Sequence, residues 1–219
     1  MPYLICAYRD YAVRLYKKLA KRYDIVLLSD PKQMTFEFVR KINPKIIFFP
    51  DWSWIVPENI INSFLCICFH ESNLPKFRGG SPLQNQIIRG IEKTKSTAFI
   101  MTRGLDEGDI LLQKDLSLKG SLAEIFDRMM ENDYDMAVKI ISGKYRRRKQ
   151  SGKPTVFKRR KPEESELRSL NYDNKYLYNF IRMLSDPYPN AFLRIRGRRI
   201  IFKSARYNGK KLEITGEIA

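Results

Sequence analysis

The chain has 219 residues, of which 43% are hydrophobic and 12% aromatic. This composition excludes an intrinsically disordered or collagen-like protein and leaves room for roughly one to two folded domains. The formal net charge is +17, from 41 Lys and Arg against 24 Asp and Glu. Such an excess of positive charge is typical of a protein that meets an anionic partner.

No apolar run approaches the ~20 residues that would span a bilayer, and the chain opens on an apolar run without a basic leader. We therefore expect a cytoplasmic protein with no membrane span. The three cysteines, Cys6, Cys66 and Cys68, lack C-x-x-C spacing, so the sequence predicts neither a disulfide framework nor a zinc site. We interpret them as buried, inert thiols.

Short apolar runs alternate with helical patterns over residues 1–142. Strands are predicted at 3–8, 25–28, 45–49, 65–69, 96–101 and 110–118, and helices at 11–22, 36–42, after Pro57, 81–89 and 121–141. This alternation favours parallel strands joined by right-handed helical crossovers. The predicted fold is α/β: residues 1–142 form a domain built on a Rossmann-like, doubly wound and mostly parallel sheet.

The composition changes at residue 143. Residues 143–166 hold two basic runs, 146–149 and 158–161, between Gly and Pro residues, and we interpret this segment as a basic linker. A helix is predicted at 172–184, and short β-like runs near 192–195, 200–202 and 212–214, with a hairpin signal at Asn208-Gly209. Residues 167–219 are therefore predicted to form a small module of a short helix and a β-hairpin.

The positive charge is concentrated in the last third of the chain. Residues 144–219 carry 21 Lys and Arg against 7 Asp and Glu, whereas residues 1–143 carry 20 against 17. This distribution favours a separate surface for RNA, a phosphorylated substrate or an acidic membrane. A face that only keeps the protein soluble is the alternative.

The only histidine, His70, lies where a predicted strand ends. Open α/β sheets bind their ligands beyond the carboxyl ends of the strands, and histidine is suited to proton transfer near neutral pH. The loop that follows contains Gly79 and Gly80, which allow a backbone to approach a ligand closely. These features make His70 a candidate catalytic residue.

A glycine-bracketed acidic turn at residues 104–110 carries Asp106 and Asp109. Most turns of this kind are only solvated loops. The turn gains a catalytic meaning if one carboxylate reaches His70, where it would fix the imidazole tautomer and stabilise the imidazolium.

These two segments carry a resemblance to a known family. His-Glu-Ser-Asn-Leu-Pro-Lys-Phe-Arg-Gly-Gly-Ser-Pro at 70–82, followed by Leu-Asp-Glu-Gly-Asp-Ile at 105–110, resembles the signature of the 10-formyltetrahydrofolate-dependent formyltransferases. Residues 157–165 and 181–192 are similar to the linker and the beginning of the C-terminal β module of that family. The resemblance implies transfer of a formyl group from 10-formyltetrahydrofolate, as co-substrate, to a primary amine, with no metal.

The resemblance also implies roles by position. His70 would act in proton transfer and Asp106 would be the essential carboxylate. The implied folate-binding residues are Leu74, Arg78, Gly79, Gly80, Leu105 and Asp109. The residues expected at the acceptor substrate are Trp52, Ser53, Trp54 and Ser72, and packing over the core is the alternative for at least one tryptophan.

One position departs from the family pattern. The family has an asparagine that donates to the oxyanion two residues before the histidine, whereas this chain has Cys68, and a thiol is a weak donor. Losing one such donor lowers the rate by about 10²- to 10³-fold. Gln84 and Asn85 supply the missing amide in the explanation that we favour; the alternatives are a backbone N–H or binding without turnover. Covalent catalysis by Cys68 is a further alternative, although buried thiols are usually inert.

We expect an N-formyltransferase whose acceptor is a nucleotide-linked or phosphorylated amino sugar. The alternative is methionyl-tRNA, for which the basic last third would supply phosphate contacts. The short tail argues against tRNA. Only 27 residues follow Phe192, and these are too few to form the larger C-terminal barrel that we expect of the tRNA enzymes. An alternative of another class is a weakly active formyltransferase-like module that binds RNA or protein. The oligomeric state stays open, with a homodimer as one expectation.

Overall fold

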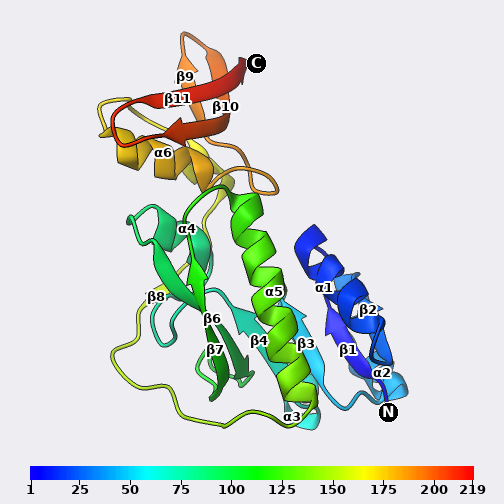
Figure 1. Ribbon diagram of the computed structural model, residues 1–219. Helices are drawn as coiled ribbons and strands as arrows, with labels where there is room; N and C mark the ends of the chain where they lie inside the picture. The colour runs from blue at the N-terminus through cyan, green and yellow to red at the C-terminus, as the bar shows by residue number, and fades with distance from the viewer.

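The computed structural model describes residues 1–219. Its main sheet has six strands in the order β2-β1-β3-β4-β6-β7 (Figure 1). The first four strands pair in parallel and the last two are antiparallel, which confirms the predicted mostly parallel α/β sheet. The strand bounds are β1 (Tyr3–Cys6), β2 (Ile25–Leu28), β3 (Ile47–Pro50), β4 (Cys66–His70), β6 (Lys93–Ile100) and β7 (Ile110–Ser117).

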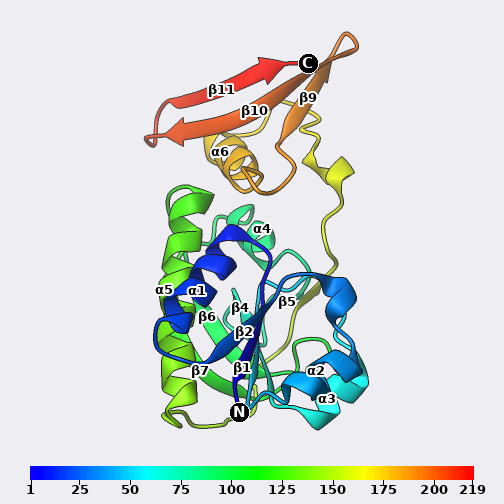
Figure 2. The same ribbon diagram turned by 90° about the vertical axis from the view of Figure 1, so that its right-hand side faces the viewer.

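Helices cover both faces of this sheet (Figure 2). α1 (Asp10–Ala20) and α5 (Leu122–Ile141) pack side by side on one face, and α2 (Phe36–Ile42) and α3 (Glu58–Ser63) lie on the other. A core of 32 buried residues fills the first face and continues into the C-terminal part of the chain through residues such as Phe180 and Phe202, and a core of 10 fills the second face. The central strands are therefore buried on both sides, which explains why β3 is apolar throughout rather than alternating.

Local sequence signals set where the helices begin and end. α5 begins at a capping box in which the Ser121 hydroxyl accepts from the Glu124 N–H and the Glu124 carboxylate accepts from the Ser121 N–H. α2 begins at Thr35, whose hydroxyl accepts from the Phe38 N–H, and ends at Asn43 in the left-handed conformation. The predicted bounds of α2 and β2 agree with the structure.

The C-terminal module consists of α6 (Asn174–Arg182) and an antiparallel sheet in the order β11-β10-β9 (Figure 1). The strands are β9 (Phe192–Ile195), β10 (Arg198–Tyr207) and β11 (Leu212–Ile218), and the last two are longer than predicted. Arg182 is buried, and its Nη1 donates to the carbonyl oxygens of Leu118 and Gly120 at 2.7 and 2.8 Å. These bonds join the module to the loop between β7 and α5.

The predicted linker contacts the main sheet domain closely, and we call residues 148–162 the strap. β8 (Val156–Phe157) pairs in parallel with β5 (Arg78–Gly79), a two-stranded sheet that the sequence analysis did not predict. Arg148 exchanges backbone hydrogen bonds of 2.8 and 3.0 Å with Ile110. The strap leads through a short 3₁₀ helix (Pro162–Ser165) toward α6. Two further short elements are a 3₁₀ helix at Pro31–Gln33, after β2, and α4 (Pro82–Ile87), after β5. The domain boundaries at 142 and 166 stay a prediction.

Candidate active site

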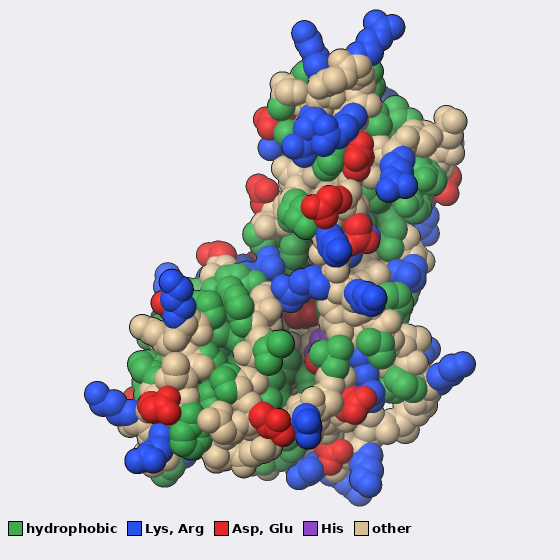
Figure 3. Space-filling model, turned by 180° about the vertical axis from the view of Figure 1, so that it is seen from behind, with side chains coloured by type: hydrophobic (Ala, Val, Ile, Leu, Met, Phe, Trp, Pro, Cys, Tyr) green, Lys and Arg blue, Asp and Glu red, His purple; other side chains and the backbone are tan.

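A cavity of about 690 Å³ opens beyond the carboxyl ends of β3 and β4. Figure 3 shows it as a hollow in which the only histidine is visible, with Lys and Arg side chains along one rim. The lining comes from the segments after β1, β3 and β4, from the turn before β7, from the start of α4, from the strap, and from Ser165 and the turn after α6 that holds Tyr188. This is the edge at which open α/β sheets bind ligands.

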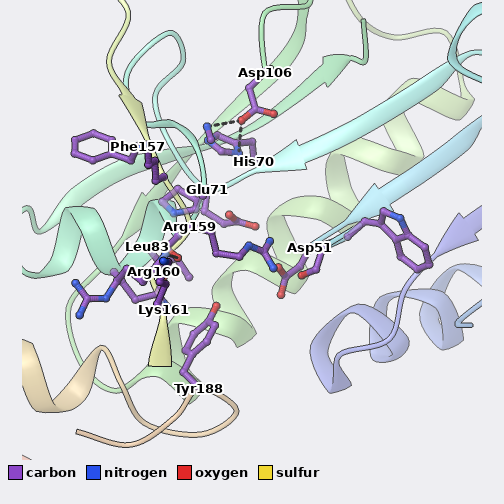
Figure 4. Close-up of a pocket in the computed structure, with 18 of the residues that line it drawn as sticks. Asp51, His70, Glu71, Leu83, Asp106, Phe157, Arg159, Arg160, Lys161 and Tyr188 are labelled. Carbon is purple, nitrogen blue, oxygen red and sulfur yellow. Dashed lines mark hydrogen bonds and ion pairs between the residues drawn. The ribbon is translucent and has the colours of Figure 1, made fainter. Parts of the chain in front are cut away.

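His70 and Asp106 meet in this cavity (Figure 4). His70 ends β4 and is 6% exposed, and its Nδ1 lies 3.7 Å from Asp106 Oδ2. Its Nε2 lies 2.8 Å from the carbonyl oxygen of Phe77. Because a carbonyl only accepts, Nε2 carries a hydrogen, and Nδ1 is the nitrogen that can accept a proton. The structure thus brings together the two residues that the resemblance pairs.

The Asp106 carboxylate and its turn are held in place by backbone groups and by the strap. Asp106 Oδ2 accepts from the Gly79 N–H at 2.7 Å. Gln150, from the strap, donates through Nε2 to the carbonyl oxygens of Asp106 (2.7 Å) and Gly108 (2.8 Å). Asp106 has φ +52° and Phe77 has φ +58°. Backbone strain of this kind in non-glycine residues clusters at functional sites.

The two amides predicted to replace the family's asparagine are placed differently. Asn85 Nδ2 donates to the carbonyl oxygens of Gly80 and Ser81 at 3.2 and 3.0 Å, and Asn85 does not line the cavity. Gln84 is 3% exposed and lines the cavity, beside the hydroxyl of Tyr188. The bonds within its own helix turn therefore hold Asn85 away from the cavity, and Gln84 is the amide that faces it.

Cys68 lines the cavity two residues before His70. Burial, with the negative charge of Asp106 nearby, raises the pKa of the Cys68 thiol well above its usual range. The thiol therefore stays protonated at neutral pH, which argues against a covalent nucleophile. Cys6 and Cys66 are buried, as predicted.

An aromatic wall closes one side of the cavity. Trp52, Ser53 and Trp54 all line it, and the two indole rings lie 4.8 Å apart between centroids. Tyr8 packs 4.6 Å from Trp54, and its hydroxyl lies 2.6 Å from Ser53 Oγ. Trp52 also packs against Phe49 of the smaller core, whereas Trp54 is 42% exposed. Trp52 therefore both packs against the smaller core and lines the cavity, whereas the Trp54 ring is more exposed to solvent and more accessible to a ligand.

Two predicted ligand contacts lie behind the cavity wall. Leu74 packs with Phe99 and Ile110 in a small apolar cluster. Ser72 is fully buried, and its hydroxyl donates to the carbonyl oxygen of Lys76 at 2.6 Å. Neither side chain lines the cavity. Their contacts shape the loop after β4 instead.

Two other predicted folate contacts, Arg78 and Asp109, form ion pairs around the acidic turn. Arg78 pairs with Glu107 at 3.1 Å and donates to Gln150 Oε1 at 2.9 Å. Asp109 pairs with Arg147 at 2.6 Å. Neither residue lines the cavity. Both side chains therefore tie the turn that carries the Asp106 carboxylate to the predicted linker.

Gly79 and Gly80 line the cavity, but the strap accounts for their lack of a side chain. A Cβ on Gly79 would lie 2.3 Å from the Phe157 carbonyl oxygen, and one on Gly80 would lie 2.3 Å from Arg159 Cα. Gly79 also has φ +90°. The sequence predicts that these glycines let the loop approach a ligand closely. In the structure, the backbone of the strap is what approaches them.

The strap supplies lining residues that the sequence analysis assigned to a linker. They are Val156, Phe157, Lys158, Arg159, Arg160, Lys161 and Pro162. Phe157 stacks on Phe77 at 5.2 Å between centroids. About eighty residues separate the strap from the loop that it covers, and no apolar periodicity marks it. The signals in the sequence are the basic run at 158–161 and the similarity of residues 157–165 to the linker of the family, and neither predicts a place in the cavity wall.

Two further carboxylates, Asp51 and Glu71, line the cavity. Asp51 Oδ2 lies 2.7 Å from Arg9 Nε. Burial raises the pKa of Asp51 to about 6, although the Arg9 charge opposes this shift. Burial, reinforced by the Asp51 charge, raises the pKa of Glu71 well above its usual range. Asp51 was not among the site residues predicted from the sequence.

The structure contains no group of three or more His, Cys, Asp or Glu side chains arranged to hold a metal ion. None of its helices has the length and apolar character that crossing a membrane requires.

Comparison with known proteins identifies the family. Residues 17–141 match the family model described as formyl transferase, and residues 162–219 match the one described as methionyl-tRNA formyltransferase, C-terminal domain. The chain belongs to the formyl transferase family. The resemblance seen in its motifs is therefore confirmed.

Three relatives show how far the similarity extends. The methionyl-tRNA formyltransferase of Clostridium botulinum is 30% identical over 199 residues, which is 84% of this chain and 63% of that protein. The chain thus spans about three fifths of the length of the curated relatives that it matches. A solved methionyl-tRNA formyltransferase from Clostridium thermocellum is 39% identical, with a TM-score of 0.94, over 100% of this chain and 99% of that one. A sugar N-formyltransferase from Shewanella is 18% identical, with a TM-score of 0.73, over 95% and 99%, and shares the fold.

Proposed function

We propose that this protein transfers a formyl group from 10-formyltetrahydrofolate to the amino group of methionyl-tRNA. The observation that carries formyl transfer is the pairing of His70 Nδ1 with Asp106 in the cavity of a formyl transferase family member. Support for tRNA comes from residues 162–219, which match a model described as the C-terminal domain of methionyl-tRNA formyltransferase. The solved chain of that name, similar over its whole length, adds to this support.

This proposal replaces the amino sugar that the sequence analysis preferred. That preference rests on the 27 residues after Phe192, which are fewer than we expect of a tRNA enzyme. The solved methionyl-tRNA formyltransferase from Clostridium thermocellum, which this chain covers to 99%, supports tRNA in spite of that expectation. The exposed Lys and Arg side chains of the last third are suited to phosphate contacts.

In this proposal His70 and Asp106 act as a proton-transfer pair. The Phe77 carbonyl keeps a hydrogen on Nε2, so that Nδ1 takes the proton released by the attacking amine. Asp106 then stabilises the imidazolium, while its bond to the Gly79 N–H keeps the carboxylate in position. His70 returns the proton from Nδ1 to the leaving nitrogen.

The cavity has the chemistry that a folate co-substrate needs. Trp54 and Leu105 offer apolar surface for a planar pterin ring, and Arg160 and Lys161 offer positive charge for the carboxylates of its tail. Bound there, the co-substrate supplies the electrophilic formyl carbon. Gly79 and Gly80 form part of the same wall, whereas Leu74, Arg78 and Asp109 would act by shaping the loops behind it.

A second candidate acceptor is a nucleotide-linked amino sugar. The observation that favours it is the aromatic wall, because the Trp52 and Trp54 rings line the same cavity as His70 and offer aromatic surface for a sugar or base ring. The same assay decides between the two acceptors.

The test is formyl transfer by the purified protein with 10-formyltetrahydrofolate and either methionyl-tRNA or an amino-sugar nucleotide. We expect formylated methionyl-tRNA, and a fall in rate of about 10²- to 10⁴-fold in His70→Ala and Asp106→Asn. The asparagine of the second variant still accepts from Gly79, so the turn stays in place. Formylation of the sugar alone would favour the second candidate, and no turnover with either acceptor would leave a module that only binds.

A further inference from the structure

One side chain of the strap, Gln150, donates to two backbone carbonyl oxygens in the turn that carries Asp106. Its Nε2 lies 2.7 Å from the carbonyl oxygen of Asp106 and 2.8 Å from that of Gly108. Neither oxygen accepts a hydrogen bond from a backbone N–H. Asp106 also has φ +52°, a conformation that residues other than glycine rarely adopt. Without Gln150, both carbonyl oxygens lose their protein donor and the turn is free to relax.

Arg78 fixes the orientation of the Gln150 amide. Its Nε and Nη2 donate to Gln150 Oε1 at 3.2 and 2.9 Å. The reversed amide would set its NH₂ against the guanidinium and its oxygen against two carbonyl oxygens, so Nε2 faces the turn. The next residue along the chain, Gly79, donates through its N–H to Asp106 Oδ2 at 2.7 Å. Arg78 and Gly79 therefore hold both parts of Asp106, its carbonyl through Gln150 and its carboxylate directly.

The strap does not need the Gln150 side chain to contact the main sheet domain. Arg148 exchanges two backbone hydrogen bonds with Ile110, β8 pairs with β5, and Phe157 stacks on Phe77. Loss of the Gln150 amide removes none of these contacts. Its effect therefore falls on the turn rather than on the strap.

The distance between Asp106 and His70 makes the position of this turn decisive. Asp106 Oδ2 lies 3.7 Å from His70 Nδ1. An N–H···O hydrogen bond needs a separation of about 3.2 Å or less, so a small displacement decides whether the carboxylate reaches the imidazole. A misplacement of about 1 Å at a catalytic group lowers the rate by up to about 10²-fold.

We propose that Gln150 is a positioning residue, which holds the Asp106 carboxylate at His70 by fixing the backbone of the turn. This inference rests on the proposed function. Gln150 does not line the cavity, so it contacts neither substrate there. Because it acts on proton transfer through Asp106, its substitution should lower kcat and leave the KM of both substrates nearly unchanged.

A double-mutant cycle with Asp106 tests this coupling. Gln150→Ala should lower kcat by about 10- to 10²-fold in the wild-type background and by less than about 2-fold in Asp106→Asn, where the carboxylate that it positions is already gone. A residue that only stabilises the fold would lower kcat equally in both backgrounds, and that result would overturn the inference. Gln150→Met, which keeps the length of the side chain but cannot donate, should behave like Gln150→Ala.

The chain has a single histidine, and this gives a second readout that needs no substrate. In protein with ¹⁵N-labelled histidine, the imidazole signals of His70 report its tautomer and charge. We expect Gln150→Ala to move these signals in the same direction as Asp106→Asn, with no further change in the double variant. Arg148→Ala is the control, because it removes a side-chain bond from the strap to Gln113 and leaves the turn untouched, so the signals should stay at their wild-type positions.

The two readouts separate this inference from the proposed function. Binding of tetrahydrofolate with unchanged affinity shows that a variant is folded, and Gln150→Met takes the place of Gln150→Ala if the latter does not fold. If the wild-type protein formylates neither acceptor while the His70 signals change as expected, the proposed function alone fails. If the wild-type protein formylates methionyl-tRNA, and Gln150→Ala keeps its kcat or its His70 signals, this inference alone fails.

Discussion

At the scale of single residues, His70 and Asp106 meet in the cavity, and a cysteine stands two positions before His70, where the resemblance leads us to expect an asparagine. Cys68, which stands there, is only half-buried, unlike the buried thiol that the sequence predicts, and desolvation raises its pKa so that the thiol stays protonated. Of the two amides nearby, Asn85 already bonds to the carbonyl oxygens of its own helix turn, and Gln84 faces the cavity. Gln84 is therefore the side chain that we propose as the oxyanion donor.

Alanine substitutions separate these two amides. Gln84→Ala should lower kcat by about 10²-fold, because a preorganised donor is lost, with little effect on folding. Asn85→Ala should leave kcat nearly unchanged and lower the free energy of unfolding by about 1 kcal/mol, because two carbonyl oxygens lose their donor. Steady-state kinetics and thermal unfolding of both variants give the answer. Equal losses of kcat would mean that neither amide has the assigned role.

At the scale of elements, the strap is the segment whose role the structure changes most. It pairs with β5, holds the turn of Asp106 through Gln150, and forms one rim of the cavity. Two adjacent glycines, Gly79 and Gly80, leave the space into which it packs. The predicted linker is thus part of the active-site wall.

A single methyl group tests this contact. The Cβ of Gly80→Ala would lie 2.3 Å from the backbone of Arg159, so the strap must move away, and we expect faster proteolysis at the strap together with lower formyl transfer. Gly104→Ala is the matched control, because its Cβ meets only the flexible side chain of Glu107. Limited proteolysis followed by mass spectrometry locates the cuts. A Gly80→Ala strap as resistant as that of Gly104→Ala would contradict the packing argument.

The elements and the strand-end position of the site could be predicted from the sequence, because periodicity and turn residues act locally. The apolar run of β3 and the break at Asn43 are signals of this kind. Side-chain orientation could not be predicted: Leu74 points into an apolar cluster and Asp109 pairs with Arg147, although both lie in motifs of the site. Contacts between residues far apart in the chain decide such orientations. The packing of the strap against Gly79 and Gly80 depends on contacts of the same kind, and it could not be predicted either.

At the scale of the whole molecule, catalysis and charge occupy different parts of the chain. The pair of His70 and Asp106 belongs to a nearly neutral part, whereas residues 144–219 hold 21 Lys and Arg against 7 Asp and Glu. Arg182 and the strap join the two parts. The basic surface is therefore fixed with respect to the cavity, as binding of one long anionic acceptor would require.

Salt concentration tests whether that acceptor is a nucleic acid. Each phosphate neutralised by a Lys or Arg contributes a slope of about −0.7 to −0.9 to a plot of log affinity against log salt concentration. We therefore expect the affinity for methionyl-tRNA to fall steeply with salt. Arg198→Gln and Arg206→Gln, exposed on β10, should each make the slope about one unit shallower, whereas Lys21→Gln, exposed just after α1, should not change it. An affinity that is insensitive to salt, or equally reduced slopes in all three variants, would count against tRNA and in favour of the small amino-sugar acceptor.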